Sequence, residues 1–130
     1  MAVARDVLSL EVSCDPHAPR VVRDALAAAY DGGWSLDDGL LVASELVTNA
    51  VRRSGCMVDH RLRVDVGRRE NCLLISVHDP GVSGKDAEPV HTKRSEPGGW
   101  GLALIERLSL RWGSERSNGY RVWAELPAYG

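Results

Sequence analysis

The chain has 130 residues, which is enough for one domain with a hydrophobic core and too few for two. With 44% hydrophobic and 26% charged residues the composition is ordinary for a globular protein, and a formal net charge of −2 gives no general attraction to nucleic acid or to an anionic membrane. We therefore expect a single domain over residues 1–130 that binds neither nucleic acid nor a membrane directly.

Two further observations concern the cellular environment. No apolar run approaches the roughly 20 residues of a membrane-spanning helix, and residues 1–6 lack the basic and apolar regions of a signal peptide, so we expect a cytoplasmic protein. The three cysteines, Cys14, Cys56 and Cys72, form no Cys-x-x-Cys pair and indicate neither a metal site nor a disulfide framework. We expect them to be reduced thiols with a structural role.

The chain begins with a predicted strand and a predicted helix. Apolar and polar residues alternate over 7–13, which is typical of a half-buried strand. Asp15 and Pro16 then predict an N-cap and a first-turn proline for a helix that continues to about Tyr30. The Asp-Gly-Gly sequence at 31–33 predicts its end.

A second and longer helix is predicted over 36–54, with Ser35 as its cap and Asp38 at the capping-box position. Its apolar residues recur at helical spacing, which predicts a buried face. The stripe comprises Leu40, Ala43, Val47, Ala50 and Val51, and Leu41 and Leu46 widen it. Glu45 and Asn49 lie one turn apart on this helix and point the same way. Because burying either without a partner is costly, we expect a polar group over that face.

The middle of the chain predicts a hairpin followed by a long connection. Residues 61–67 alternate, residues 72–78 form a more apolar run, and the turn residues between them favour pairing of the two strands. The stretch 82–98 is rich in Gly, Pro, Lys and Glu and has no periodicity. A loop of this length in a compact domain is usually functional, and we predict a lid.

The last part predicts a short helix over 102–108 and a second hairpin, with strands at 110–115 and 120–126. The Ser-Asn-Gly sequence at 117–119 is a strong hairpin signal. Helices and hairpins are partly segregated along the chain. We therefore predict an α+β two-layer sandwich, with a mixed, mostly antiparallel sheet and about three helices on one face.

Three features of this sequence can support chemistry. Asn49 offers an amide oxygen, a ligand that suits Mg²⁺, and Glu45 could accept a proton from an attacking hydroxyl group. Asp79 follows a buried strand and could accept a hydrogen bond from an exocyclic amine, with Gly81 leaving room for a flat ring. The glycine-rich stretch 98–101 leads into a helix, a place that favours phosphate binding.

Each feature also has a purely structural interpretation. Glu45 and Asn49 could belong to a hydrogen-bonded polar helix face, and Asp-Pro-Gly at 79–81 could be an ordinary turn. The glycines at 98–101 could form a flexible connection.

In combination, however, these features resemble a known family. Residues 45–51 resemble the N box of the GHKL ATPase superfamily, residues 79–81 its first glycine box, and residues 99–102 its second. Within that superfamily the chain resembles anti-sigma factor serine/threonine kinases of the RsbW and SpoIIAB type and related small actinobacterial ATP-binding regulators. The resemblance covers nearly the whole chain and implies the Bergerat fold of histidine-kinase-like ATPases.

The resemblance also implies roles for individual residues. Asn49 would coordinate Mg²⁺, Glu45 would be the catalytic base, and Asp79 would bind the adenine amino group of ATP. Three further positions would contact the cofactor: Gly81 in the adenine pocket, and Gly99 and Gly101, followed by Leu102, along the phosphates. The chain differs from many relatives in having Arg53 where they have histidine.

These considerations favour an ATP- and Mg²⁺-dependent serine/threonine kinase that phosphorylates an antagonist (anti-anti-sigma, STAS-like) protein and sequesters a sigma factor, thereby regulating transcription. The resemblance is also compatible with a homodimer. Two alternatives stay open: a nucleotide-binding interaction module with little or no phosphotransfer, and a small domain without nucleotide in which Glu45 and Asn49 are only structural.

Overall fold

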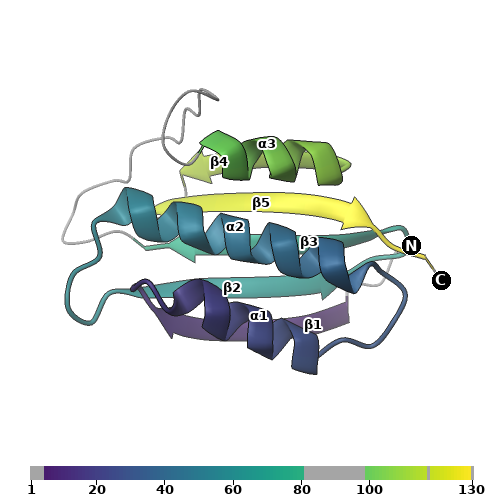
Figure 1. The fold of residues 1–130 in the computed structure, drawn as a ribbon, viewed down its shortest axis with the longest axis horizontal. Helices are drawn as coiled ribbons and strands as arrows, with labels where there is room; N and C mark the ends of the chain where they lie inside the picture. The colour runs from purple at the N-terminus through teal and green to yellow at the C-terminus, as the bar shows by residue number, and fades with distance from the viewer. Residues whose placement is uncertain (1–4, 81–98, 117, 130) are drawn as a thin grey trace.

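The structure is a computed structural model of the chain, and it describes residues 5–80, 99–116 and 118–129 (Figure 1). Eight elements follow one another along the chain: β1 (Arg5–Ser13), α1 (Ala18–Ala28), α2 (Leu36–Ser54), β2 (Arg61–Arg68), β3 (Cys72–Asp79), α3 (Gly99–Leu108), β4 (Arg111–Arg116) and β5 (Tyr120–Pro127). This order is the predicted one. The predicted lid at 82–98 and the candidate Gly81 lie outside the described residues.

The five strands form one sheet with the order β1-β2-β3-β5-β4. All three helices lie on the same face of this sheet (Figure 1). The α+β class and the two-layer arrangement are therefore confirmed. Each of the four strand pairings is antiparallel. The described sheet therefore has no parallel pair, whereas the prediction is a mixed, mostly antiparallel sheet.

The hydrophobic core lies between the sheet and the helices, and it is filled mainly by branched aliphatic side chains. Its fully buried members include Val22, Leu26, Val42, Leu46, Val47, Leu62, Val64, Leu73, Ile75 and Ile105. Trp34, just before α2, is the largest buried side chain among the described residues, and its ring packs against Gly39 so closely that a Cβ atom there would overlap it. Gly39 therefore allows the start of α2 to lie on the indole.

Helix α1 begins later than its sequence signals predict. Its first helical residue is Ala18, and Pro19 is the proline of its first turn. The carboxylate of Asp15 instead accepts a hydrogen bond from the backbone N–H of His17, at 2.7 Å. Asp15 thus closes a local turn ahead of the helix, a competing use of Asp side chains near helix ends.

Helix α2 has the predicted bounds and the predicted N-cap. The Ser35 side chain accepts a hydrogen bond from the N–H of Asp38 at 3.2 Å, and Gly55 ends the helix in the left-handed conformation with φ of 61°. Of the two residues expected to widen the apolar stripe, Leu46 is fully buried but Leu41 is 37% exposed. The expectation for Leu41 is wrong because the buried arc is centred on the side of Val42 and Leu46.

Among the described residues, no helix combines the length and the apolar composition that a membrane crossing would require.

The turn between β4 and β5 lies against the end of β3. Asn118 and Gly119 both have positive φ, 49° and 112°, as the Asn-Gly signal predicts for a tight hairpin. Gly119 packs on the backbone of Asp79 and Pro80, where a Cβ atom would overlap main-chain atoms. Only glycine fits here, because the backbone conformation and the space both exclude a side chain.

Candidate functional site

One face of α2 presents three polar side chains in a row. Glu45, Asn49 and Arg53 follow one another at intervals of four residues and therefore lie on one side of the helix, spanning ~12 Å along its axis. Glu45 and Asn49 are both partly buried. The Nδ2 atom of Asn49 is buried and finds no hydrogen-bond partner within the described ranges. A buried amide donor of this kind needs an acceptor, which a ligand could provide.

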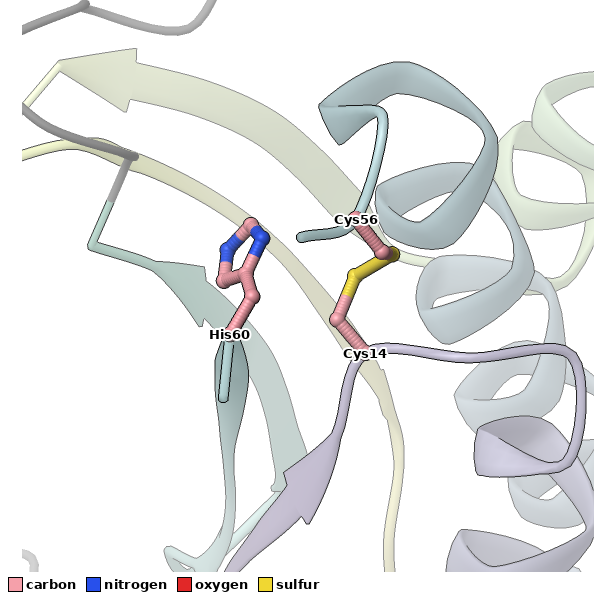
Figure 2. Close-up of side chains that lie close together, drawn as sticks. All are labelled: Cys14, Cys56 and His60. Carbon is pink, nitrogen blue, oxygen red and sulfur yellow. A yellow bond between two sulfur atoms is a disulfide. The ribbon is translucent and has the colours of Figure 1, made fainter. Parts of the chain in front are cut away.

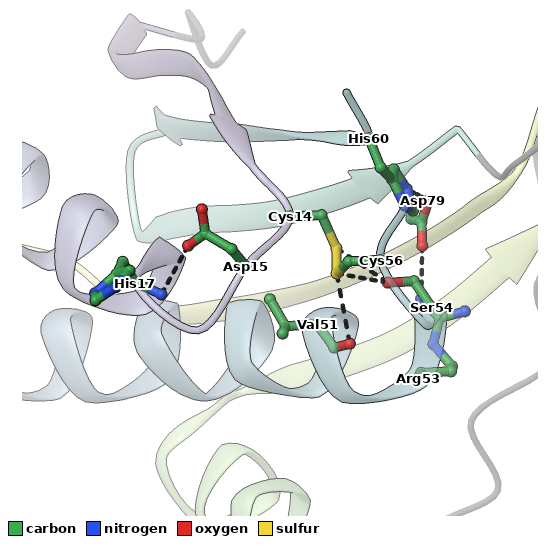
Figure 3. Close-up of a disulfide and its surroundings, with 9 residues drawn as sticks. All are labelled: Cys14, Asp15, His17, Val51, Arg53, Ser54, Cys56, His60 and Asp79. Atoms are coloured by element: carbon green, nitrogen blue, oxygen red, sulfur yellow. Dashed lines mark hydrogen bonds and ion pairs between the residues drawn. A yellow bond between two sulfur atoms is a disulfide. The ribbon is translucent and has the colours of Figure 1, made fainter. Parts of the chain in front are cut away.

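The Arg53 end of this face meets Asp79, the last residue of the central strand β3. The Asp79 side chain is 1% exposed, and its Oδ1 atom accepts a hydrogen bond from Nε2 of His60 at 2.7 Å. Its Oδ2 atom lies 4.0 Å from Nη2 of Arg53. Figure 3 shows the carboxylate between these two residues. Burial of an anion is tolerated here because a cation and a hydrogen-bond donor flank it.

Arg53 also stacks on an aromatic ring. Its guanidinium carbon lies 3.9 Å from the centroid of the Tyr120 ring, a cation–π contact. Burial lowers the pKa of the Arg53 guanidinium, while the charge of Asp79 and the Tyr120 side chain oppose that change. Tyr120 is also the residue opposite Asp79 in the β3–β5 pairing. The sheet register therefore fixes the carboxylate and the ring side by side, and α2 brings Arg53 to both.

The structure brings part of the predicted site together. The α2 face that contains Glu45 and Asn49 leads directly to Asp79 through Arg53. The two second-box glycines, Gly99 and Gly101, lie inside the first turn of α3, because this helix begins three residues earlier than the predicted start at 102. Leu102, expected near the phosphates, is a 3% exposed core residue.

Within the part of the chain that the structure describes, the Glu45 carboxylate has no hydrogen bond or ion pair. A carboxylate in this state can accept a proton from another molecule.

Sequence reasoning misses two members of this site. Arg53 has a signal, because it continues the four-residue spacing of Glu45 and Asn49, yet its charge alone does not indicate a role beside Asp79. His60 has no such sequence signal. It lies in the connection before β2 and reaches Asp79 only because β2 pairs with β3. A functional residue that lies in a connection takes part in no periodic pattern, so only the folded structure shows what it contacts.

The cysteine prediction is wrong for two of the three residues. Cys14 and Cys56 form a disulfide, with a Cα–Cα distance of 5.4 Å, and only Cys72 is free among the described cysteines. The pair links the residue after β1 to the second residue beyond α2, 42 positions apart (Figure 3). Such a pairing depends on where the ends of two elements meet, which spacing along the chain does not reveal.

The residues of this site fit a nucleotide and its magnesium ion. A buried, unpartnered amide at Asn49 matches phosphate oxygens through its N–H and a hard cation through its oxygen. A carboxylate can accept about four hydrogen bonds, so Asp79 can receive an amine in addition to His60. Asn49 lies on the α2 face that leads through Arg53 to Asp79 at the end of β3.

Comparison with known proteins gives the family. The family model described as histidine kinase-like ATPase domain matches residues 13–124, which include every described element of the site. No curated protein matches the chain. The chain therefore belongs to the histidine kinase-like ATPase domains, the ATP-binding domains of the GHKL superfamily.

Proposed function

We propose that this protein is an anti-sigma-factor-like serine/threonine kinase, which uses ATP and Mg²⁺ to phosphorylate an antagonist (anti-anti-sigma) protein and which sequesters a sigma factor. The observation that supports the proposal best is the polar face of α2. Among the described residues, the Glu45 carboxylate and the Nδ2 atom of Asn49 on this face have no hydrogen-bond partner, and the face ends at Arg53 beside the buried carboxylate of Asp79.

Each residue has a distinct task in this proposal. Asp79 accepts a hydrogen bond from the adenine amino group and orients the base. Asn49 ligates Mg²⁺, which when bound neutralises charge on the phosphates and stabilises the transferring group. Glu45 accepts the proton of the serine or threonine hydroxyl group of the antagonist. Glu45 and Asn49 are four positions apart on the helix, ~6 Å along the axis, a spacing that suits a base beside a metal-bound phosphate.

Regulation follows from competition between two partners. Whichever partner has the higher affinity for the nucleotide-bound form occupies it, because a ligand shifts an equilibrium only by its difference in affinity between states. Phosphorylation of the antagonist would weaken its binding and leave the protein to the sigma factor. A homodimer is compatible with this scheme.

The alternative is a regulatory interaction module with little or no phosphotransfer. One observation favours it: the Asp79 carboxylate is 1% exposed and already accepts a hydrogen bond from His60. A nucleotide would therefore share this buried carboxylate with His60. Such an arrangement can hold a nucleotide without requiring turnover.

Nucleotide binding is tested first, by thermal unfolding of the protein with and without ATP and Mg²⁺. A ligand present at 100 times its dissociation constant stabilises the folded state by about 2.7 kcal/mol. We expect a clear rise in the unfolding midpoint with ATP and Mg²⁺ and a smaller one with ATP alone. No shift at saturating nucleotide would support the non-nucleotide interpretation, in which Glu45 and Asn49 are structural.

Phosphotransfer is tested with radiolabelled ATP and candidate antagonist proteins encoded near the gene. Wild-type protein should label its antagonist, whereas Glu45→Gln should bind ATP normally and transfer no label. Glu11→Gln, an exposed change on β1, is the matched control and should transfer like wild type. Binding of both partners without transfer by the wild type would favour the interaction module, and transfer by the Glu45 variant would exclude it as the base.

A further inference from the structure

A second cluster of reactive side chains lies on the other side of His60. Cys14 directly follows β1, and its N–H donates to the carbonyl oxygen of His60 at 2.8 Å, which extends the β1–β2 pairing by one position. Gly55 ends α2 in the left-handed conformation and turns the chain toward Cys56. Three elements thus place two sulfurs and one imidazole together, as Figure 2 shows.

The cluster places a third potential metal ligand, His60, beside the Cys14–Cys56 disulfide. One ligand atom from each of Cys14, Cys56 and His60 lies within 4.8 Å of the others. In the neutral imidazole whose Nε2–H donates to Asp79, the Nδ1 atom of His60 carries a lone pair. This Nδ1 atom is buried and has no hydrogen-bond partner among the residues that the structure describes. The His60 side chain is 3% exposed, so solvent does not readily satisfy it.

We propose that the reduced protein binds one Zn²⁺ ion through the thiolates of Cys14 and Cys56 and Nδ1 of His60. Two thiolates and an imidazole are the ligands that zinc prefers, and three protein ligands leave one position for water. A pocket of about 290 Å³ opens beside Cys14 and His60, lined also by Met57, Val58 and Asp59. It gives the ion and its water a route from solvent.

Two neighbouring side chains support this ligand set. The Asp79 carboxylate holds the far nitrogen of His60 at 2.7 Å, the carboxylate–histidine arrangement that orients metal-bound imidazoles. The hydroxyl group of Ser54 lies 3.1 Å from Sγ of Cys14 and 3.3 Å from Sγ of Cys56. From there it can donate a hydrogen bond to a thiolate and partly offset its charge.

Zinc binding and the disulfide exclude each other, because a disulfide sulfur is not a thiolate. A trialkylphosphine interconverts the two states in a balanced step. It breaks the Cys14–Cys56 bond, takes the oxygen of one water molecule to become the phosphine oxide, and leaves the two protons of that water on the two thiols. Zn²⁺ then displaces both thiol protons, which pass to the buffer. The site is therefore available only after a two-electron reduction.

The proposal does not depend on kinase activity, but it has a consequence for the nucleotide site. Asp79 would support the metal through His60 and would also be the acceptor proposed for the adenine amine. A change in the position of His60 on metal binding or on oxidation therefore acts directly on that carboxylate. The two sites share one side chain.

Cobalt replaces zinc as a spectroscopic probe in the decisive experiment. Full-length protein is reduced with the phosphine, freed of reductant and metal under nitrogen, and titrated with Co²⁺. We expect one Co²⁺ per chain, with thiolate-to-cobalt charge-transfer absorption and the visible bands of tetrahedral Co²⁺, all abolished by one equivalent of Zn²⁺. The oxidised protein, identical in sequence, should give none of these bands. Absence of the bands from reduced protein would overturn the proposal.

Variants then identify the ligands. Cys14→Ser, Cys56→Ser and His60→Ala should each weaken Co²⁺ binding by more than the ~10- to 100-fold that an outer-shell partner contributes. Cys72→Ser is the matched control, because Cys72 lies in β3 outside the cluster, and it should bind like wild type. Circular dichroism verifies that each variant is folded. Loss of the cobalt spectrum in the Cys72 variant, or its retention in the Cys14 variant, would contradict the proposed ligand set.

Discussion

Nε2 of His60 and Oδ1 of Asp79 lie 2.7 Å apart, and both side chains are almost completely buried, at 3% and 1% exposure. The pair connects the proposed nucleotide site with the cysteine cluster, since Asp79 lies beside Arg53 at the end of the polar face of α2 and His60 adjoins the two cysteines. His60 and Arg53 flank the Asp79 carboxylate on two sides, so the fold itself fixes the orientation of this side chain.

Asp79→Asn tests the contribution of this carboxylate to nucleotide binding. The amide can still accept from His60, so the fold should persist, but the charged acceptor for the adenine amine is lost. We expect ATP affinity to fall by about 10- to 150-fold, equivalent to about 1.5–3 kcal/mol for a hydrogen bond with a charged partner. Isothermal titration calorimetry measures the change.

Asp65→Asn provides the matched control for this experiment. Asp65 lies on the neighbouring strand β2, where it bonds with Ser9 and Arg63 at the surface. The same chemical change there should leave ATP affinity unaltered. Equal ATP affinity for Asp79→Asn and wild type would remove Asp79 from the proposed adenine site.

Arg53→Met tests how the cation stabilises the fold. Methionine keeps most of the length and the apolar contact with Tyr120 but removes the charge between that ring and Asp79. We expect the free energy of unfolding to fall by about 1–3 kcal/mol, the sum of a buried cation–π contact and a weakened ion pair. Urea unfolding followed by tryptophan fluorescence measures it. Arg52→Met, one residue away and exposed, is the control and should change the free energy of unfolding little. An equal loss of stability in both variants would show that the Arg53 contacts do not stabilise the fold.

Gly39→Ala sets helix propensity against packing. Alanine is favoured over glycine in a helix interior by about 0.8–1 kcal/mol, but its Cβ would overlap the buried ring of Trp34. Overpacking a core typically costs about 1–3 kcal/mol. We expect a net destabilisation of about 1–2 kcal/mol in chemical unfolding. A stabilised variant would mean that the indole moves aside without cost.

Reduction of the disulfide should lower stability through the unfolded state. Closing a loop of 42 residues restricts the unfolded chain, and the chain-entropy relation gives a limit of about 4 kcal/mol. We expect reduction by a phosphine, with a chelator present to remove metal, to lower the urea midpoint of wild type. Cys72→Ser should behave as wild type in both redox states, whereas Cys14→Ser should be insensitive to reduction. An unchanged midpoint for reduced wild type would contradict the expected stabilisation.

The order of elements is predictable because each is encoded by a local pattern. Period-two alternation identifies most of the strands, the Ser35 cap marks the start of α2, and Asn118-Gly119 identifies the last hairpin. These signals act over a few residues, and tertiary packing does not oppose them. The exception in α1 is instructive, because Asp15 forms a local turn in place of the predicted cap.

The site is only partly predictable, for a physical reason. Glu45, Asn49 and Asp79 belong to regular elements, and their positions in the sequence are enough to suggest a shared ligand. The Cys14–Cys56 bond and the His60 contact instead require the ends of β1, α2 and β2 to meet. That meeting is a result of the whole fold, and no short window of sequence contains it.

The close packing of Gly119 on Asp79 and Pro80 has an evolutionary consequence. The hairpin tip between β4 and β5 looks like an ordinary surface turn, where insertions are usually harmless. Here it is wedged against the main chain of the residue proposed to select adenine. A change at this tip would therefore act on the main chain of Asp79 without replacing its side chain. The tip is thus a position at which homologous domains, or protein engineers, can alter the proposed preference for adenine.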